Sequence, residues 1–190
     1  ITGNVPQGAG LSSSASFEMA ILKTIVALYQ LDLDGVTAAL MGQRAENEFV
    51  GCQCGIMDQL VSALGLEGHA MLLDCRSLTF QDAPLPDGIV ILVVNSNVKR
   101  GLVDSEYNAR RQQCEEVASI LNVPALRDVS LEQLNGAKTN LSQEQYRRAR
   151  HVVTENARTI AAMTAMQTND IKTLGSLMGQ SHDSLRYDYE

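Results

Sequence analysis

The stretch Gly8–Ser16 reads GAGLSSSAS and leads into a near-continuous apolar segment that reaches Tyr29. A glycine-rich turn that opens a helix presents unpaired backbone N–H groups and the positive end of the helix dipole to one point in space, which is what a phosphate requires. The glycines let the backbone approach a ligand closely, and the serines can cap the helix or offer hydroxyls to a phosphate or a magnesium ion. The stretch predicts a site for a phosphorylated ligand, with an ordinary Gly/Ser turn and a serine cap as the alternative.

Two common phosphate-binding patterns do not fit this stretch. No lysine lies between Gly3 and Ala20, so the lysine contact of a Walker loop is missing. No third glycine follows Gly10 at the spacing of the dinucleotide fingerprint. What remains is the pattern Pro-x-Gly-x-Gly-Leu-Ser-Ser-Ser-Ala, which begins at Pro6.

The composition indicates a globular chain and excludes several classes of partner. Of the 190 residues 45% are hydrophobic, which suffices for one large domain or two small ones. The net charge of −7 arises before Asn95, and with only 4% aromatic residues and no basic stripe we expect no nucleic-acid partner. No apolar run approaches the ~18 residues of a membrane span, so we expect no membrane partner.

The cysteines indicate a reducing compartment. Cys52 and Cys54 are two residues apart, whereas Cys75 and Cys114 stand alone, so no second close pair completes a zinc site. We therefore expect free thiols in a cytoplasmic protein.

Periodicity and chain breakers predict two halves that meet at the break Pro84–Gly88. The first helix is apolar on most sides, so we expect it to be buried. The run Ile89–Val94 is rich in β-branched residues and predicts a buried strand. Capping boxes begin at Ser130 and Ser142. The expected helices are 12–29, 34 or 35 to 49, 56–64, 104–121, a short one after Ser130, 142–167 and 170–186, and the expected strands are 69–75, 77–81 and 89–94.

Three motifs in a fixed order resemble the GHMP family of small-molecule kinases, and its galactokinases in particular. They are Pro6–Ser16, then Gly51–Gln59 (GCQCGIMDQ), and then Asn95–Lys99 (NSNVK) followed by Ser105–Tyr107. Three motifs in the order of the family are far less probable by chance than any single one.

The resemblance implies an α+β fold, namely the two-domain GHMP kinase fold with an active site in the cleft between its domains. Residues 1–87 would be the C-terminal part of the N-terminal, ATP-binding domain, and residues 88–190 the N-terminal part of the C-terminal domain. The upstream Gly-Glu-His-x-Asp type signature and the C-terminal glycine-rich motif of galactokinases have no match in the chain. We therefore expect the middle portion of a longer, monomeric enzyme, and we expect these 190 residues alone to be inactive.

The implied activity is transfer of the γ-phosphoryl group of ATP to the C1 hydroxyl of galactose, with Mg2+ and with galactose and ATP as small-molecule partners. Two alternatives stay open: another GHMP sugar kinase, such as one for N-acetylgalactosamine, and a non-catalytic sensor of galactose and ATP. The pair Ser14–Ala15 is intact, which favours an enzyme, because such sensors can lack it. A generic phosphate-binding module is a weaker third possibility.

The resemblance also assigns roles to residues. Asp58, at the start of a helix whose dipole would keep it ionised, is the expected catalytic proton acceptor, although a helix N-terminal aspartate can be a plain structural charge. Ser14 and Glu46 are the expected magnesium ligands, with Ser13 as the near alternative to the serine. Gly55, Asp58 and Tyr107 are the expected sugar contacts. The expected nucleotide-binding residues are Gly8, Ala9, Gly10, Leu11, Ser12, Ser13 and Ser14.

Overall fold

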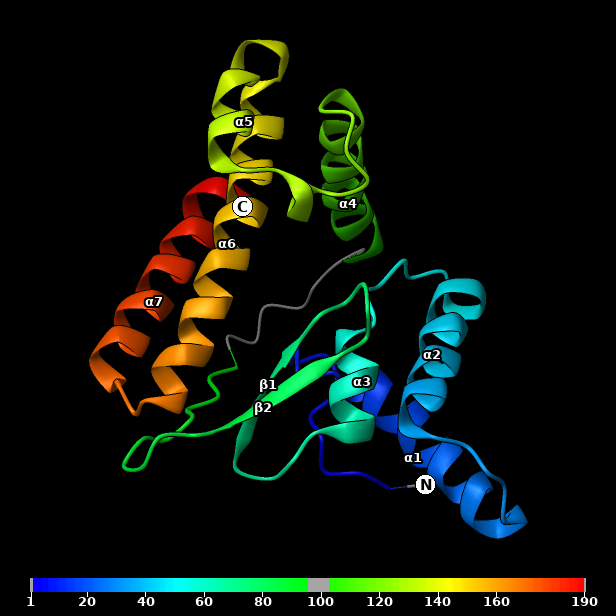
Figure 1. Ribbon diagram of the computed structural model, residues 1–190. Helices are drawn as coiled ribbons and strands as arrows, with labels where there is room; N and C mark the ends of the chain where they lie inside the picture. Colours follow the sequence, from blue (N-terminus) through cyan, green and yellow to red (C-terminus); the bar gives the residue numbers. More distant parts are fainter. Residues whose placement is uncertain (1, 96–102, 190) are drawn as a thin grey trace. The chain divides into compact units, whose positions relative to one another are not determined.

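The computed structural model describes residues 2–95 and 103–189, apart from the side chains of 103–107 (Figure 1). The chain divides into two compact units: unit 1 runs to Asp82 and takes up the segment that begins at Ile89, and unit 2 contains Ala83–Gly88 and the chain from Ser105 onward. The elements are α1 (Ser13–Tyr29), α2 (Gly35–Ala45), the π-helical turn η1 (Glu46–Val50), α3 (Met57–Leu64), β1 (His69–Leu73), β2 (Phe80–Pro84), α4 (Val103–Ile120), η2 (Leu126–Asp128), α5 (Leu131–Gly136), η3 (Lys138–Asn140), α6 (Gln143–Gln167), α7 (Ile171–Ser184) and η4 (Leu185–Tyr189).

The helices of unit 1 start and stop at residues suited to those positions. Gln30, in the left-handed conformation, closes α1 by donating its N–H to a carbonyl of the last turn. The Asp34 carboxylate accepts the Thr37 N–H at 2.9 Å and caps α2. Gly65 ends α3. The predicted bounds of the first and third helices are confirmed to within a residue, whereas the second predicted helix is α2 up to Ala45 and continues as the π-helical turn η1 to Val50.

The core of unit 1 is small and joins α2, α3 and the hairpin. Ala39, Ile56 and Leu60 are buried at its centre. The residues packed around them are partly buried and apolar: Val36, Ala63, Leu64, Leu73 and Leu78. This packing fixes α3, which carries the aspartate singled out in the sequence, against the helix that precedes it.

The strands β1 and β2 form a two-stranded sheet. Because a short connection of this length can join only antiparallel strands, the pair is a hairpin. The second strand begins at Phe80, three residues later than the predicted 77–81. The reason is local, since the Asp74 carboxylate accepts the N–H groups of Arg76 and Ser77 at 2.8 and 3.1 Å and holds them in a turn.

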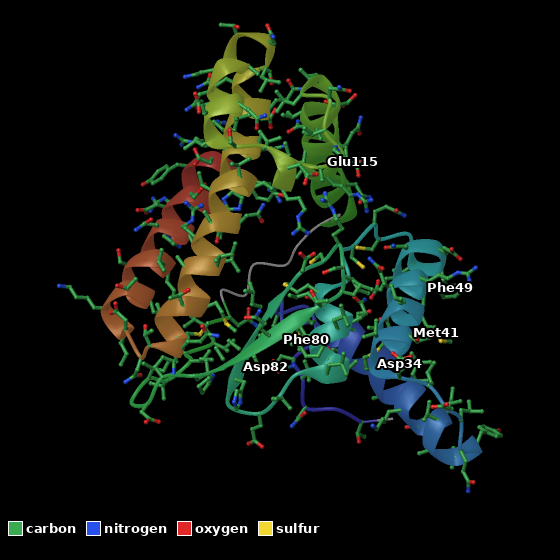
Figure 2. The ribbon with its side chains drawn as sticks, in the orientation of Figure 1. Asp34, Met41, Phe49, Phe80, Asp82 and Glu115 are labelled. Carbon is green, nitrogen blue, oxygen red and sulfur yellow. The ribbon has the colours of Figure 1, made fainter. Side chains whose placement is uncertain are left out.

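The prediction that the first helix is buried is wrong. Only Ala15 and Met19 of α1 are buried, whereas Phe17 is 51% exposed and Leu28 72% exposed. Nearby Phe49 is 92% exposed, and Figure 2 shows it among the outward side chains of unit 1. Apolar periodicity identifies faces that can be buried, but a face is covered only where another element packs on it.

The prediction of a buried strand over 89–94 is also wrong. The segment forms no strand in the structure, and Val90 and Leu92 are 94% and 83% exposed. β-branched residues favour a strand only where a neighbouring strand completes the ladder. Within the described residues the only sheet is the β1–β2 pair, so this segment has no neighbour.

Unit 2 is helical and has a core of its own. Both predicted capping boxes are confirmed: the Ser130 and Ser142 hydroxyls each accept the N–H three residues later at 3.1 Å, and the glutamine at that position bonds back to the serine N–H. The buried core residues come from α4, η2, α5 and α6 and from the residues between η2 and α5: Val117, Ala118, Leu126, Val129, Leu134 and Ala149. In the described residues no helix is both long and apolar enough to cross a membrane.

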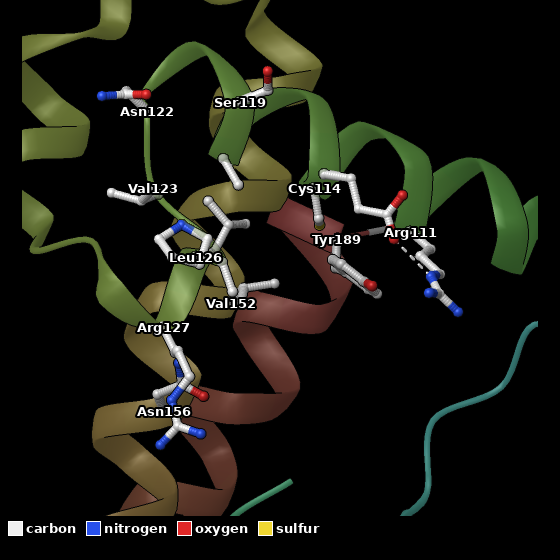
Figure 3. Close-up of a pocket in the computed structure, with 14 residues that line it drawn as sticks. Arg111, Cys114, Ser119, Asn122, Val123, Leu126, Arg127, Val152, Asn156 and Tyr189 are labelled. Atoms are coloured by element: carbon white, nitrogen blue, oxygen red, sulfur yellow. Dashed lines mark hydrogen bonds and ion pairs between the residues drawn. The ribbon is translucent and has the colours of Figure 1, made fainter. Parts of the chain in front are cut away.

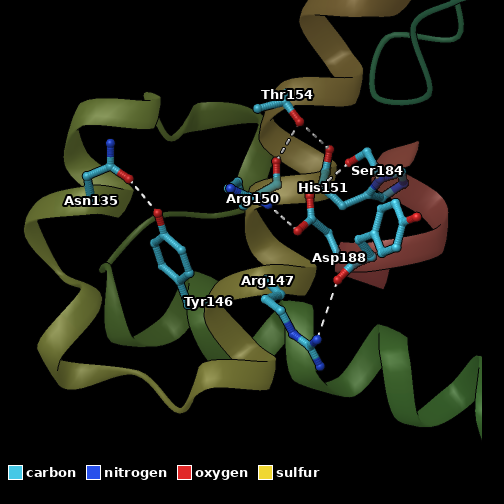
Figure 4. A network of polar contacts seen from close by, with 9 residues as sticks. Asn135, Tyr146, Arg147, Arg150, His151, Thr154, Ser184 and Asp188 are labelled. Carbon is cyan, nitrogen blue, oxygen red and sulfur yellow. Dashed lines mark hydrogen bonds and ion pairs between the residues drawn. The ribbon is translucent and has the colours of Figure 1, made fainter. Parts of the chain in front are cut away.

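A network of polar groups joins α6 to the turn η4 (Figure 4). Arg150 forms an ion pair with Asp188, a residue that is 7% exposed. Ser184 donates its hydroxyl to the other oxygen of Asp188 at 3.2 Å and lies 3.0 Å from Nδ1 of His151. The His151 ring also lies against the ring of Tyr189, with 4.6 Å between the centroids. These contacts hold the last helix and the turn that follows it on α6.

We expect this network to make the stability of the chain depend on pH. Burial is the largest cause of a lowered pKa for His151. Glu155 and Asp188 raise this pKa, and Arg158 lowers it, but burial decides the direction. Unfolded chains protonate histidine near pH 6.5, whereas the folded chain does so at a lower pH. The stability contributed by neutral His151 is therefore complete above about pH 6.5 and is lost as the pH falls through the lowered pKa. Thermal unfolding on both sides of about pH 6.5 should show this slope, and His151→Gln should reduce it. An equal slope in the His151 variant would contradict the prediction.

Candidate active site

The predicted phosphate loop has an unusual backbone. Gly8, Gly10 and Ser12 have φ values of 68°, 73° and 53°, so every second residue is left-handed. Left-handed residues in such a turn can direct neighbouring N–H groups to one side and form an anion-binding concavity. A Cβ at Gly8 would meet no atom within 4 Å, so the loop is open to a ligand.

The alternative of an ordinary serine cap does not hold. Ser12 precedes the first residue of α1, but its side chain makes no capping hydrogen bond. Its left-handed conformation costs about 1 kcal/mol or more for a residue other than glycine. The loop therefore follows a course that a simple helix cap does not require.

A cavity of about 550 Å3 lies beside the loop in unit 1. Asn4 and Gln7 from the lead-in segment and Ser13, Ser14 and Phe17 from α1 contribute to its lining. Its volume is within the usual range for small-molecule sites. The serines of the loop thus face a space that can hold a ligand group.

The structure brings the two predicted magnesium ligands together. Ser14 donates its hydroxyl to Oε1 of Glu46, although the residues are 32 positions apart in the chain. Glu46 is 8% exposed and lies where α2 widens into the π-helical turn, a feature common at functional sites. Glu48, by contrast, forms an exposed ion pair with Arg44 at 2.9 Å. Only the first of these two glutamates is directed at the loop.

The donor set fits magnesium. A hydroxyl and a carboxylate are hard oxygen ligands, and Mg2+ in nucleotide sites usually takes one or two carboxylates together with substrate phosphates and water. Because Ser14 is exposed and Glu46 is buried beside it, oxygens of a phosphate could complete the coordination from the open side.

Sequence reasoning missed two further residues at this place. Gln59 is 2% exposed, and its amide donates to Oε2 of Glu18 at 3.3 Å. Burial raises the pKa of Glu18; the bond from Gln59 lowers it, and the charge of Glu46 raises it. The signal was present in the sequence, since Glu18 follows Ser14 by four residues and so shares its helix face.

The remaining predicted residues lie as follows. Asp58 is the second residue of α3 and is exposed, and it directly precedes Gln59. Gly55 lies in the preceding loop, where a Cβ would meet nothing within 4 Å. The backbone of Tyr107 belongs to α4 in unit 2, and its side chain lies outside the described residues. Unit 1 thus contains every predicted site residue except this tyrosine.

A cavity of about 940 Å3 in unit 2 contains none of the predicted residues (Figure 3). Arg111, Cys114 and Tyr189 contribute to its lining, and Arg111 is paired with Glu115 at 2.8 Å. The pKa of the Cys114 thiol is raised, mainly by burial. Arg148 lowers this pKa and Glu115 raises it, and the thiol is protonated at neutral pH. None of the four cysteines forms a disulfide.

The chain is similar to known proteins both in sequence and in structure. Residues 1–66 match the family model of the GHMP kinase N-terminal domain. Over 99% of its length the chain is similar in structure to galactokinase from Lactococcus lactis complexed with galactose, with a TM-score of 0.89 and 30% sequence identity. The chain spans 50% of the length of that protein.

These similarities support a chain of the galactokinase type among the GHMP kinases. Its α+β fold is that of this family.

Proposed function

We propose that this chain is part of a galactokinase, which transfers the γ-phosphoryl group of ATP to the C1 hydroxyl of galactose. The observation that carries the proposal is the hydrogen bond from Ser14 to the buried Glu46. Two hard oxygen atoms beside a loop whose backbone suits an anion support a metal and phosphate site there. Kinase activity requires both in one place.

Each residue then has a role in the transfer. The N–H groups of Gly8–Ser14 would hold the phosphates of ATP, and Ser14 and Glu46 would hold the metal. When bound, Mg2+ neutralises charge on the β- and γ-phosphates. Asp58 would orient the C1 hydroxyl and accept its proton as the oxygen attacks the γ-phosphorus and the bond to ADP breaks.

Sugar binding would involve the backbone of Gly55 and the side chain of Tyr107, which offers an apolar ring face and a hydroxyl. The similarity to a galactokinase solved with galactose supports this choice of substrate. We further propose a monomeric, cytoplasmic enzyme with domains that divide at 87/88. We expect the 190 residues alone to be inactive, because phosphoryl transfer depends on positioning more groups than they contain.

The test is an assay of the complete gene product that contains these residues. We expect ADP release from Mg–ATP that depends on galactose, and a phosphorus NMR spectrum that shows a sugar 1-phosphate. N-acetylgalactosamine serves as the competing substrate, and a reaction with that sugar alone would identify another GHMP kinase. Binding of galactose and ATP without ADP release would instead identify a sensor.

A further inference from the structure

Polar side chains from three helical segments meet beneath the phosphate loop. Ser14 and Glu18 lie one helical turn apart on α1, Glu46 follows α2, and Gln59 belongs to α3. Ser14 donates to Glu46, and Gln59 donates to Glu18. The contacts form a chain from the loop to the helix that begins with Met57 and Asp58.

The carboxyl groups of Glu18 and Glu46 meet at the centre of this chain, where a side-chain hydrogen bond joins them. Burial raises the pKa of Glu18 most strongly, and the charge of Glu46 and this bond raise it too. Because Glu46 is buried, the pair is stable only if hydrogen-bond donors hold each group in place. Each carboxylate receives a donor from a different residue, Ser14 for Glu46 and Gln59 for Glu18. Loss of the Gln59 amide would leave Glu18 with its negative neighbour and without this donor.

Gly42 makes this close arrangement possible. A Cβ at Gly42 would lie 3.0 Å from Oε2 of Glu18 and 3.2 Å from Cγ of Gln59. A side chain at this position would be tighter than ordinary van der Waals contact and would displace both groups, so the glycine leaves the space in which Glu18 and Gln59 meet.

The burial of Gln59 itself indicates a role beyond packing. Its Oε1 atom is buried and has no hydrogen-bond partner among the described residues. A leucine would fill a similar volume without that unsatisfied group, whose burial costs free energy. The bond to Glu18 offsets part of this cost.

We infer that Gln59 is a positioning residue for Glu46: by holding Glu18, it confines the Glu46 carboxylate to the place from which it meets Ser14. Because Gln59 directly follows Asp58, the same contact fixes the start of α3 relative to the metal carboxylate. The inference rests on the proposed function, since it assigns metal binding to Glu46.

The test measures metal affinity directly in the complete gene product. Mn2+ binding in the presence of ADP is followed by electron paramagnetic resonance, and the Mg2+ dependence of ADP release is measured alongside. Gln59→Leu should raise the Kd for Mn2+ about 10-fold, the lower end of the range for groups that act on a metal through its ligands. The Mg2+ concentration for half-maximal activity should rise in parallel, while kcat at saturating Mg2+ falls much less.

The swap E18Q/Q59E separates positioning from packing. It restores an amide opposite a carboxylate, so its Mn2+ affinity should recover relative to E18Q and to Q59E alone. If Gln59→Leu fails to fold, the swap still tests whether Gln59 positions Glu46 through Glu18. Gln112→Leu is the matched control, because Gln112 donates to Glu116 at 3.1 Å on the surface of unit 2, and it should leave Mn2+ affinity unchanged.

The outcomes separate this inference from the proposed function. If the unsubstituted protein phosphorylates galactose but Gln59→Leu binds Mn2+ as tightly, or if the swap shows no recovery, the inference is wrong and the function stands. If the unsubstituted protein binds Mn2+ with ADP but phosphorylates no galactose, the function is wrong, and the Mn2+ affinities of the variants still decide the inference. Absence of Mn2+ binding in the unsubstituted protein overturns the inference.

Discussion

Asp58→Asn is expected to lower kcat for galactose phosphorylation by about 100-fold or more, the usual scale for loss of a general base. Asparagine keeps the size of the side chain but can neither accept the proton of the C1 hydroxyl nor attract it electrostatically. The side chain is exposed at the start of α3. The substitution should therefore act on the reaction and leave folding intact. Steady-state kinetics of ADP release, with galactose and Mg–ATP varied separately, measure the effect.

Binding of the nucleotide should change little in this variant, because the phosphate loop and Glu46 are untouched. The Kd for ADP, measured by calorimetry, checks this. Asp32→Asn is the matched control, since it removes an exposed carboxylate between α1 and α2 and should retain normal kcat. Near-normal turnover in Asp58→Asn would remove this residue from the catalytic step.

Glu46→Gln is expected to weaken magnesium-supported turnover by about 10- to 100-fold or more. Loss of a residue that only bonds to a metal ligand already has an effect of this size. The substitution replaces a charged oxygen ligand of a hard cation by a neutral amide, which binds Mg2+ poorly. Ser14→Ala should act in the same direction. Because the two side chains contact each other, the double variant should show less than the sum of the two effects on the free-energy scale.

A magnesium titration of kcat tests this second expectation, and high Mg2+ should partly restore activity if the defect lies in metal affinity. Glu48→Gln is the control, since that glutamate only pairs with Arg44 on the surface and should behave like the unsubstituted protein. Retention of full activity by both Glu46→Gln and Ser14→Ala across the titration would exclude them as metal ligands.

Short stretches of the sequence determine some features of this protein by themselves. The capping boxes at Ser130 and Ser142 set the starts of α5 and α6, because a cap depends only on residues within one turn. The glycines of Gly8–Ser16 likewise permit a left-handed course that few other residues adopt at low cost. The family resemblance also rests on the order of local motifs, and the comparisons confirm it.

Only the tertiary structure decides what depends on distant neighbours. The run 89–94 has the composition of a strand but remains exposed, because a strand needs a partner that its own residues cannot supply. The separation of Glu46 from Glu48 arises in the same way: both are glutamates of one helical segment, and packing of α2 against α1 directs one to Ser14 and leaves the other at the surface. The contact between Glu18 and Gln59 joins residues 41 positions apart. A sequence lists such residues, but the fold determines which of them meet.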